Sequence, residues 1–154
     1  MKTGLSHDDI KEQINDLQFN LPEEIYELYG WHNGNIDQLV FENFNFLPLK
    51  TALAAYYESL GEISYRNIVE AYFFEKSFPV FQLWSDSSVL LCVICDASND
   101  YPIRMIDISC KDYSFLYRNL TDLILHVAEW YESAQYYDDA QTTFQLDSKY
   151  LIQI

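Results

Sequence analysis

The chain has 154 residues and a formal net charge of −15, and 49% of its residues are hydrophobic. This composition excludes a disordered chain, and the length predicts a single domain over residues 1–154 whose core needs no disulfides or metal ions. The charge argues against DNA or RNA as a direct ligand, because binding them requires cationic side chains that displace counterions from phosphates.

The first predicted helix begins after Ser6, which is followed by two aspartates, a combination typical of a helix start. Ile10, Ile14 and Leu17 have the spacing of one apolar helix face. We expect this helix to end near Phe19.

The second predicted helix begins at Pro22, whose fixed φ suits a first helical turn. Its apolar stripe is expected to face the core and consists of Leu21, Ile25, Leu28 and His32. Asn33 and Gly34 most readily adopt the left-handed conformation that closes a helix, so His32 is expected in the last turn. A general-base role for His32 is the alternative, but no sequence pattern supplies the nucleophile or metal that it would need.

The middle of the chain changes from helical to β periodicity. Residues 38–49 predict a strand or an extended connection, and Pro48 opens a helix that is expected to end before Gly61. A further helical piece is expected over residues 65–72. Three β-rich runs follow and predict an antiparallel meander: SFPVFQLWS, SVLLCVICD and YPIRMIDIS.

The last predicted helix runs from about Asn119 to Tyr137. The apolar core stripe of this helix consists of Leu120, Leu123, Ile124, Val127, Tyr131 and Ala134. A strand is expected within residues 142–154. Helices at both ends of a central meander predict an α+β domain in which N-terminal and C-terminal helices cover an antiparallel sheet.

An acidic patch with one apolar residue is expected on the outer side of this helix. An apolar side chain ringed by acids is typical of a binding patch. The candidate partner-binding surface combines residues of the helix and of the segment after it: Asp122, Leu125, Glu129, Glu132, Asp138 and Asp139. The alternative is that the apolar residues 144–154 fold back and cover Leu125.

Lys and Arg are absent from two long segments, residues 12–49 and 119–148, and each holds at least six acidic residues. Such segments favour a basic protein as the partner, because complementary fields raise encounter rates. The alternative is that the acidity only maintains solubility. The sequence does not determine whether the two segments share one face.

Nothing in the sequence predicts membrane association or export. The longest apolar run, residues 89–95, is far shorter than the roughly 18 residues that suggest a membrane span. The first residues lack the apolar stretch of a secretory signal, and an odd number of cysteines, three, favours free thiols in a reducing compartment. We therefore expect a cytoplasmic protein.

Four blocks of the sequence resemble, in order, those of the SUKH superfamily: LPEEIYELYGWHNG, FPVFQLWSDSSVLLCVICD, YPIRMIDI and YSFLYRNLTDLILHVAEW. The resemblance covers most of residues 21–130. It assigns two sets of residues to the first two blocks. The first block, a helix and turn, takes Leu21, Pro22, Leu28, His32, Asn33 and Gly34, and the second block, of strands, takes Phe78, Pro79 and Asp96. Many relatives carry a turn rich in glycine and aspartate where this chain has SDSSV. The connection from Gly34 to Phe78 is also longer here than in compact members of the superfamily.

The superfamily includes fungal cell-wall regulators and many bacterial immunity proteins. The resemblance therefore implies a binding domain without enzymatic activity or cofactor, which in bacteria often neutralises a toxin, commonly a nuclease. A regulatory or scaffolding module without a toxin partner is the alternative, and a carboxylate-dependent hydrolase is a lesser one.

The sequence offers two weak metal-site patterns. Cys92 and Cys95 have the spacing of a zinc or redox pair, but residues three apart on a strand face opposite sides, so we interpret them as core residues. His126 and Glu129 lie three apart on the last helix, but they are not part of a paired His-Glu-x-x-His motif. No metal site is predicted.

Overall fold

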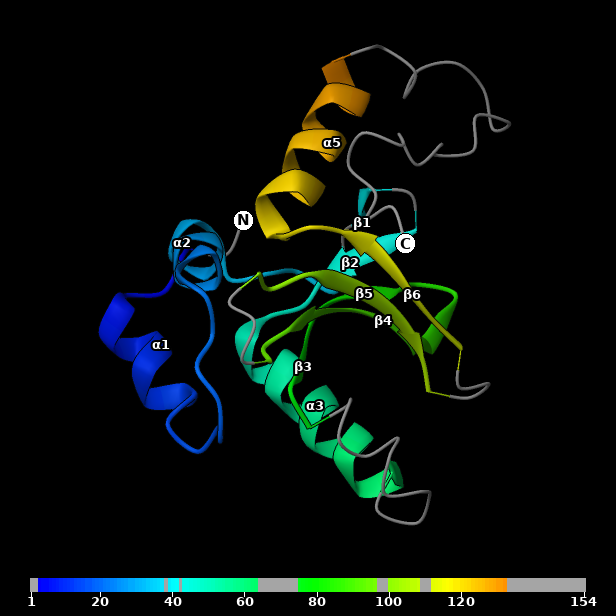
Figure 1. The fold of residues 1–154 in the computed structure, drawn as a ribbon. Helices are drawn as coiled ribbons and strands as arrows, with labels where there is room; N and C mark the ends of the chain where they lie inside the picture. Colours follow the sequence, from blue (N-terminus) through cyan, green and yellow to red (C-terminus); the bar gives the residue numbers. More distant parts are fainter. Residues whose placement is uncertain are drawn as a thin grey trace.

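The computed structural model describes residues 3–37, 39–41, 43–63, 75–96, 100–108 and 112–132 (Figure 1). Within this part of the chain the four helices are α1 (His7–Gln13), α2 (Glu23–Trp31), α3 (Leu49–Ile63) and α5 (Leu120–Glu132). The six strands are β1 (Leu39–Phe41), β2 (Phe44–Phe46), β3 (Ser77–Leu83), β4 (Asp86–Ile94), β5 (Ile103–Asp107) and β6 (Asp112–Tyr117). The α+β class predicted from the sequence is confirmed.

All six strands form one antiparallel sheet in the order β1-β2-β3-β4-β5-β6, so each strand pairs with its neighbour in sequence. The predicted meander is β3, β4 and β5. The segment before it, expected as a strand or a connection, forms the hairpin of β1 and β2. β6 was not predicted, because no element was assigned to residues 112–117.

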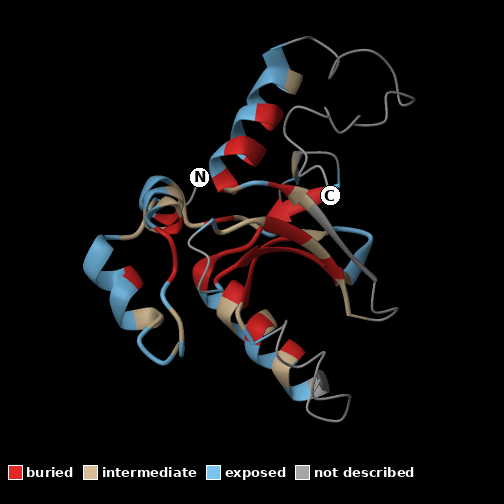
Figure 2. Cartoon of the chain, viewed as in Figure 1, coloured by how far each residue is buried: buried red, intermediate tan, exposed pale blue. Residues whose placement is uncertain are grey.

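The sheet curls between helices, with α5 above it and α3 below it in the view of Figure 1. The main core contains residues of all four helices and of one face of the strands, among them Ile10, Tyr29, Ala52, Val93 and Leu123. The opposite face of the sheet carries a smaller buried cluster of Leu90, Cys92, Ile94 and Ile106. Figure 2 shows this burial concentrated along the sheet.

The predicted ends of the first and third helices are wrong. α1 ends at Gln13 rather than near Phe19, because the chain turns at Asn15 and Asp16, residue types that favour turns. α3 continues through Gly61 to Ile63, since a glycine inside a helix weakens it by only about 1 kcal/mol.

Three predictions lie outside the described residues: the helix over 65–72, the part of the last helix beyond Glu132, and the strand within 142–154. None of the described helices combines the length and the apolar character needed to cross a membrane.

Candidate protein-binding groove

The His32-Asn33-Gly34 turn attaches the end of α2 to the junction of β2 and α3. The Asn33 side chain accepts a hydrogen bond of 2.9 Å from the Leu49 N–H, at the start of α3. The Tyr29 hydroxyl donates to the Leu47 carbonyl at 3.0 Å. Gly34 has a φ of 57°, and a Cβ there would lie 2.4 Å from backbone atoms of Leu47 and Pro48.

The predicted left-handed residue is therefore confirmed, but its place relative to the helix was wrong. α2 ends at Trp31, and His32 has an extended backbone that bridges Thr3. The helix stops early because the bridge to Thr3 holds His32 in an extended conformation. The His32 ring lies near the Phe46 ring, with centroids 6.3 Å apart and planes tilted by 39°, and it lines a surface pocket beside α2.

The other residues of the two family blocks have mainly structural positions. Leu21 and Pro22 are buried at the start of α2, and Phe78 and Pro79 are buried in β3. Asp96 is exposed just after β4.

The start of α5 is held against α2. Asn119 accepts a hydrogen bond of 2.8 Å from the Asp122 N–H, as a helix N-cap does. The Glu24 carboxylate of α2 accepts from the Thr121 N–H at 3.3 Å and from the Thr121 hydroxyl. A negative charge at a helix N-terminus is favourable, so Glu24 both caps α5 and fixes it beside α2.

The predicted phase of α5 was partly wrong. Asp122, expected on the outside, is only 8% exposed and accepts a hydrogen bond of 2.6 Å from Arg118. His126 is also buried, 2.9 Å from the Tyr117 hydroxyl. Ile124 and Tyr131, expected in the core, are each 37% exposed. Polar side chains with partners occupy inward positions here, which hydrophobic periodicity could not reveal.

Three other residues of the candidate surface lie on the exposed side of α5. Leu125 is 51% exposed, and Glu129 and Glu132 are exposed. Leu125, Glu129 and Glu132 follow one another at helical spacing and so share one stripe. Asp138 and Asp139 lie outside the described residues.

Two adjoining pockets form a groove between α2, β1 and α5, and they share Leu28 and Ile124. The first, of about 180 Å³, is mostly apolar and includes Trp31, Leu39 and Phe46 in its lining. The second, of about 200 Å³, lies between Glu27 of α2 and Leu125 of α5. We call this surface the α2/α5 groove.

Exposed apolar side chains gather at the α2/α5 groove. Of the eight large hydrophobic residues that are exposed in the described part of the chain, four line the groove: Trp31, Leu39, Ile124 and Leu125. Such clustering on one surface is typical of interaction sites, whereas single exposed hydrophobics are ordinary.

The walls of the groove come from the two segments that lack Lys and Arg. α2 and β1 belong to residues 12–49, and α5 belongs to residues 119–148. Hydrogen bonds join the walls at two places, from Thr121 to Glu24 and from the Tyr131 hydroxyl to the Val40 carbonyl. The fold therefore brings these elements of the two segments side by side, which the sequence did not determine.

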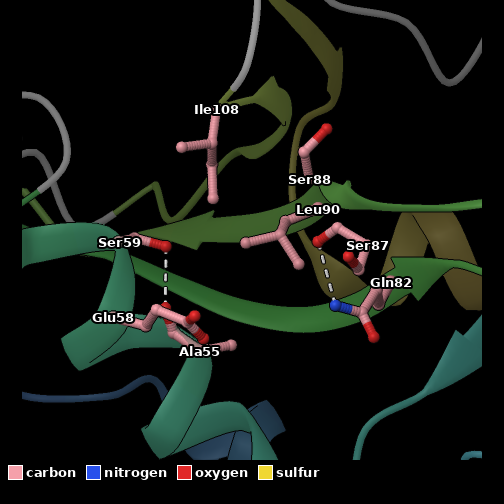
Figure 3. A pocket seen from close by; sticks show the side chains of 8 residues that line it. All are labelled: Ala55, Glu58, Ser59, Gln82, Ser87, Ser88, Leu90 and Ile108. Carbon is pink, nitrogen blue, oxygen red and sulfur yellow. Dashed lines mark hydrogen bonds between the residues drawn. The ribbon is translucent and has the colours of Figure 1, made fainter. Parts of the chain in front are cut away.

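A separate, more polar pocket of about 270 Å³ lies away from the groove, between α3 and the β3–β4 hairpin (Figure 3). Its serines and glutamine are engaged locally: Ser59 donates to the Ala55 carbonyl at 2.7 Å, and Gln82 donates to the Ser87 carbonyl at 3.0 Å. Glu58 is the one carboxylate among the residues that line it, and none of them is a histidine. Its lining thus lacks the carboxylate pair that the hydrolase hypothesis requires.

The two described cysteines are core residues, as predicted. Cys92 and Cys95 are buried on opposite faces of the sheet. Burial raises the pKa of both thiols, and together with the nearby Asp96 it raises that of Cys95 to about 12. In the residues that the structure describes, no three His, Cys, Asp or Glu side chains are grouped to hold a metal ion.

Comparison with known protein families gives a match. The sequence model of the SMI1 / KNR4 family (SUKH-1) matches residues 4–126, which is most of the chain and includes α2, the whole sheet and the first half of α5. No curated protein sequence matches the chain.

Proposed function

Because this chain belongs to the SMI1 / KNR4 family (SUKH-1), a family of immunity-type and regulatory modules, we propose that it is a protein-binding module that neutralises a basic toxin. It acts by binding rather than by catalysis, in the cytoplasm, and as one domain. The observation that carries the proposal is the α2/α5 groove, where exposed apolar side chains lie between two walls without Lys or Arg.

This arrangement suits the blocking of a cationic effector. A toxin that acts on nucleic acid carries a basic surface, because it must bind phosphates. Acidic side chains around the groove would steer that surface into contact, and the apolar residues would supply affinity once water is expelled. A protein held there would cover the basic surface and keep its substrate out.

The test is affinity capture with the full tagged chain from lysate of the source cells. The captured protein is then expressed alone and together with this chain. We expect the captured protein to be basic and to stop growth when expressed alone, and co-expression to restore growth. A specific partner that is harmless alone would contradict the immunity role and favour a regulatory module. Absence of any partner would contradict the binding module itself.

A further inference from the structure

We infer that the α2/α5 groove takes a lysine- or arginine-rich protein segment that inserts aliphatic or aromatic side chains where its two pockets meet. The inference rests on the proposed protein-binding function and adds where the partner binds and what chemistry it presents. The meeting point is formed by Leu28 of α2 and Ile124 of α5, which line both pockets.

The two adjoining pockets, of about 180 and 200 Å³, offer recesses for the side chains of a partner segment. Trp31, which is 72% exposed, lines the first pocket, and Leu125, which is 51% exposed, lines the second. A partner segment lying along the groove would cover both, with its own anchors inserted between them.

The charges around the groove select a cationic partner. Glu27 lines the second pocket, and Glu132 belongs to the stripe of Leu125 on α5. Neither α2, β1 nor α5 contains Lys or Arg, so no Lys or Arg of these elements pairs with either carboxylate. An acidic or neutral partner would desolvate them without compensation, whereas Lys or Arg side chains would pair with them. The same argument disfavours an anionic lipid surface.

The test uses synthetic helical peptides and the full chain. The first peptide combines lysines on one face with leucines on the other, the second replaces the leucines with serines, and the third replaces the lysines with glutamates. We expect the chain to bind the first peptide at least about tenfold more tightly than either of the others, as measured by fluorescence anisotropy at physiological salt.

Matched variants locate the binding surface. Trp31→Ser and Leu125→Ser should each weaken binding of the lysine–leucine peptide by about tenfold. Trp84→Ser and Tyr57→Ser are the controls, because Trp84 and Tyr57 are also exposed but lie outside the groove. They should leave the affinity within about twofold. Thermal melts verify that each variant is folded, and the conservative Trp31→Phe should retain binding if Trp31→Ser does not fold.

Four results would overturn the inference. The first two are an affinity for the serine peptide equal to that for the lysine–leucine peptide, and a loss of affinity in Trp84→Ser equal to that in Trp31→Ser. The other two are a dimer of the wild-type chain that dissociates on Trp31→Ser, and binding of the wild-type chain to anionic vesicles that Trp31→Ser abolishes. A natural partner held equally well by wild type and by both groove variants would also overturn it, while leaving the proposed function intact. Failure of the wild type to hold any natural partner would instead count against the proposed function.

Discussion

At Gly34 the addition of one methyl group would disturb the fold. Its φ of 57° is unfavourable for any other residue, and a Cβ would lie 2.4 Å from the backbone at Leu47 and Pro48. Gly34→Ala should therefore lower the free energy of unfolding by more than about 1 kcal/mol. Urea denaturation measures the change.

Gly61 provides the matched control, since a Cβ there would contact nothing within 4 Å and the residue lies inside α3. Gly61→Ala should raise the free energy of unfolding by roughly 0.5–1 kcal/mol. If both substitutions changed stability alike, the close approach of Gly34 to Leu47 would not be a constraint on this fold.

The buried thiols make stability depend on pH in the alkaline range. The pKa of Cys95 is raised from 9.0 to about 12 in the folded chain, mainly by burial, so the unfolded state ionises first. Its contribution is fully present below pH 9 and is lost as the pH rises toward 12. Between pH 7 and pH 10 one such thiol should remove roughly 1 kcal/mol from the free energy of unfolding.

Urea unfolding at the two pH values checks this effect. The Cys95→Ala variant should start from a lower stability at pH 7, because it leaves a small cavity, and should lose less on going to pH 10. An unchanged loss would show that Cys95 is not the group responsible.

At the scale of elements, substitutions at two leucines of α5 test how this helix is oriented. Leu125 is 51% exposed, whereas Leu123 is 0% exposed. Leu125→Asp should change the free energy of unfolding by no more than about 0.5 kcal/mol, and Leu123→Asp should lower it by several kcal/mol. Thermal or urea unfolding of the two variants makes the comparison, and a large loss at Leu125 would mean that this side chain is covered.

The sequence predicted the elements whose pattern is local. α2 was predicted from Pro22 and its apolar spacing, and the meander from three runs with β periodicity. β6 could not be predicted in the same way, because pairing with β5 decides its conformation. Similarly, Asp122 and His126 can face inward because each has a hydrogen-bond partner, Arg118 and Tyr117 respectively. Such hydrogen bonds depend on the tertiary structure and not on a local sequence pattern.

The candidate site was predictable only in part. The exposure of Leu125, Glu129 and Glu132 was predicted from the sequence, because an apolar residue among acids is visible in a helical pattern. Trp31, Leu39 and Ile124 were missed as groove residues. The missing signal was the adjacency of α2 and α5, which depends on the contact of Glu24 with Thr121 and on no local pattern.

At the scale of the whole molecule, charge should govern how fast a partner associates. If the carboxylates around the groove steer a basic protein, the association rate should fall steeply as ionic strength rises, and the dissociation rate should change little. Stopped-flow measurements with the captured partner test this expectation.

The variant with Glu27, Glu129 and Glu132 all replaced by glutamine should associate more slowly at low salt and show a flatter salt dependence. An association rate that ignores salt in the wild-type chain would contradict electrostatic steering, although not the fold or the groove.

The contact between Glu24 and Thr121 joins residues 97 positions apart in the sequence. This separation determines when, during synthesis of the chain, the groove can form and bind a partner. At about 5–20 residues per second, several seconds separate the emergence of α2 from that of α5 at the ribosome. Throughout that interval one wall of the groove exists without the other. A nascent chain therefore cannot hold a partner in the groove, and binding should lag behind the synthesis of α2 by at least the time needed to complete and dock α5.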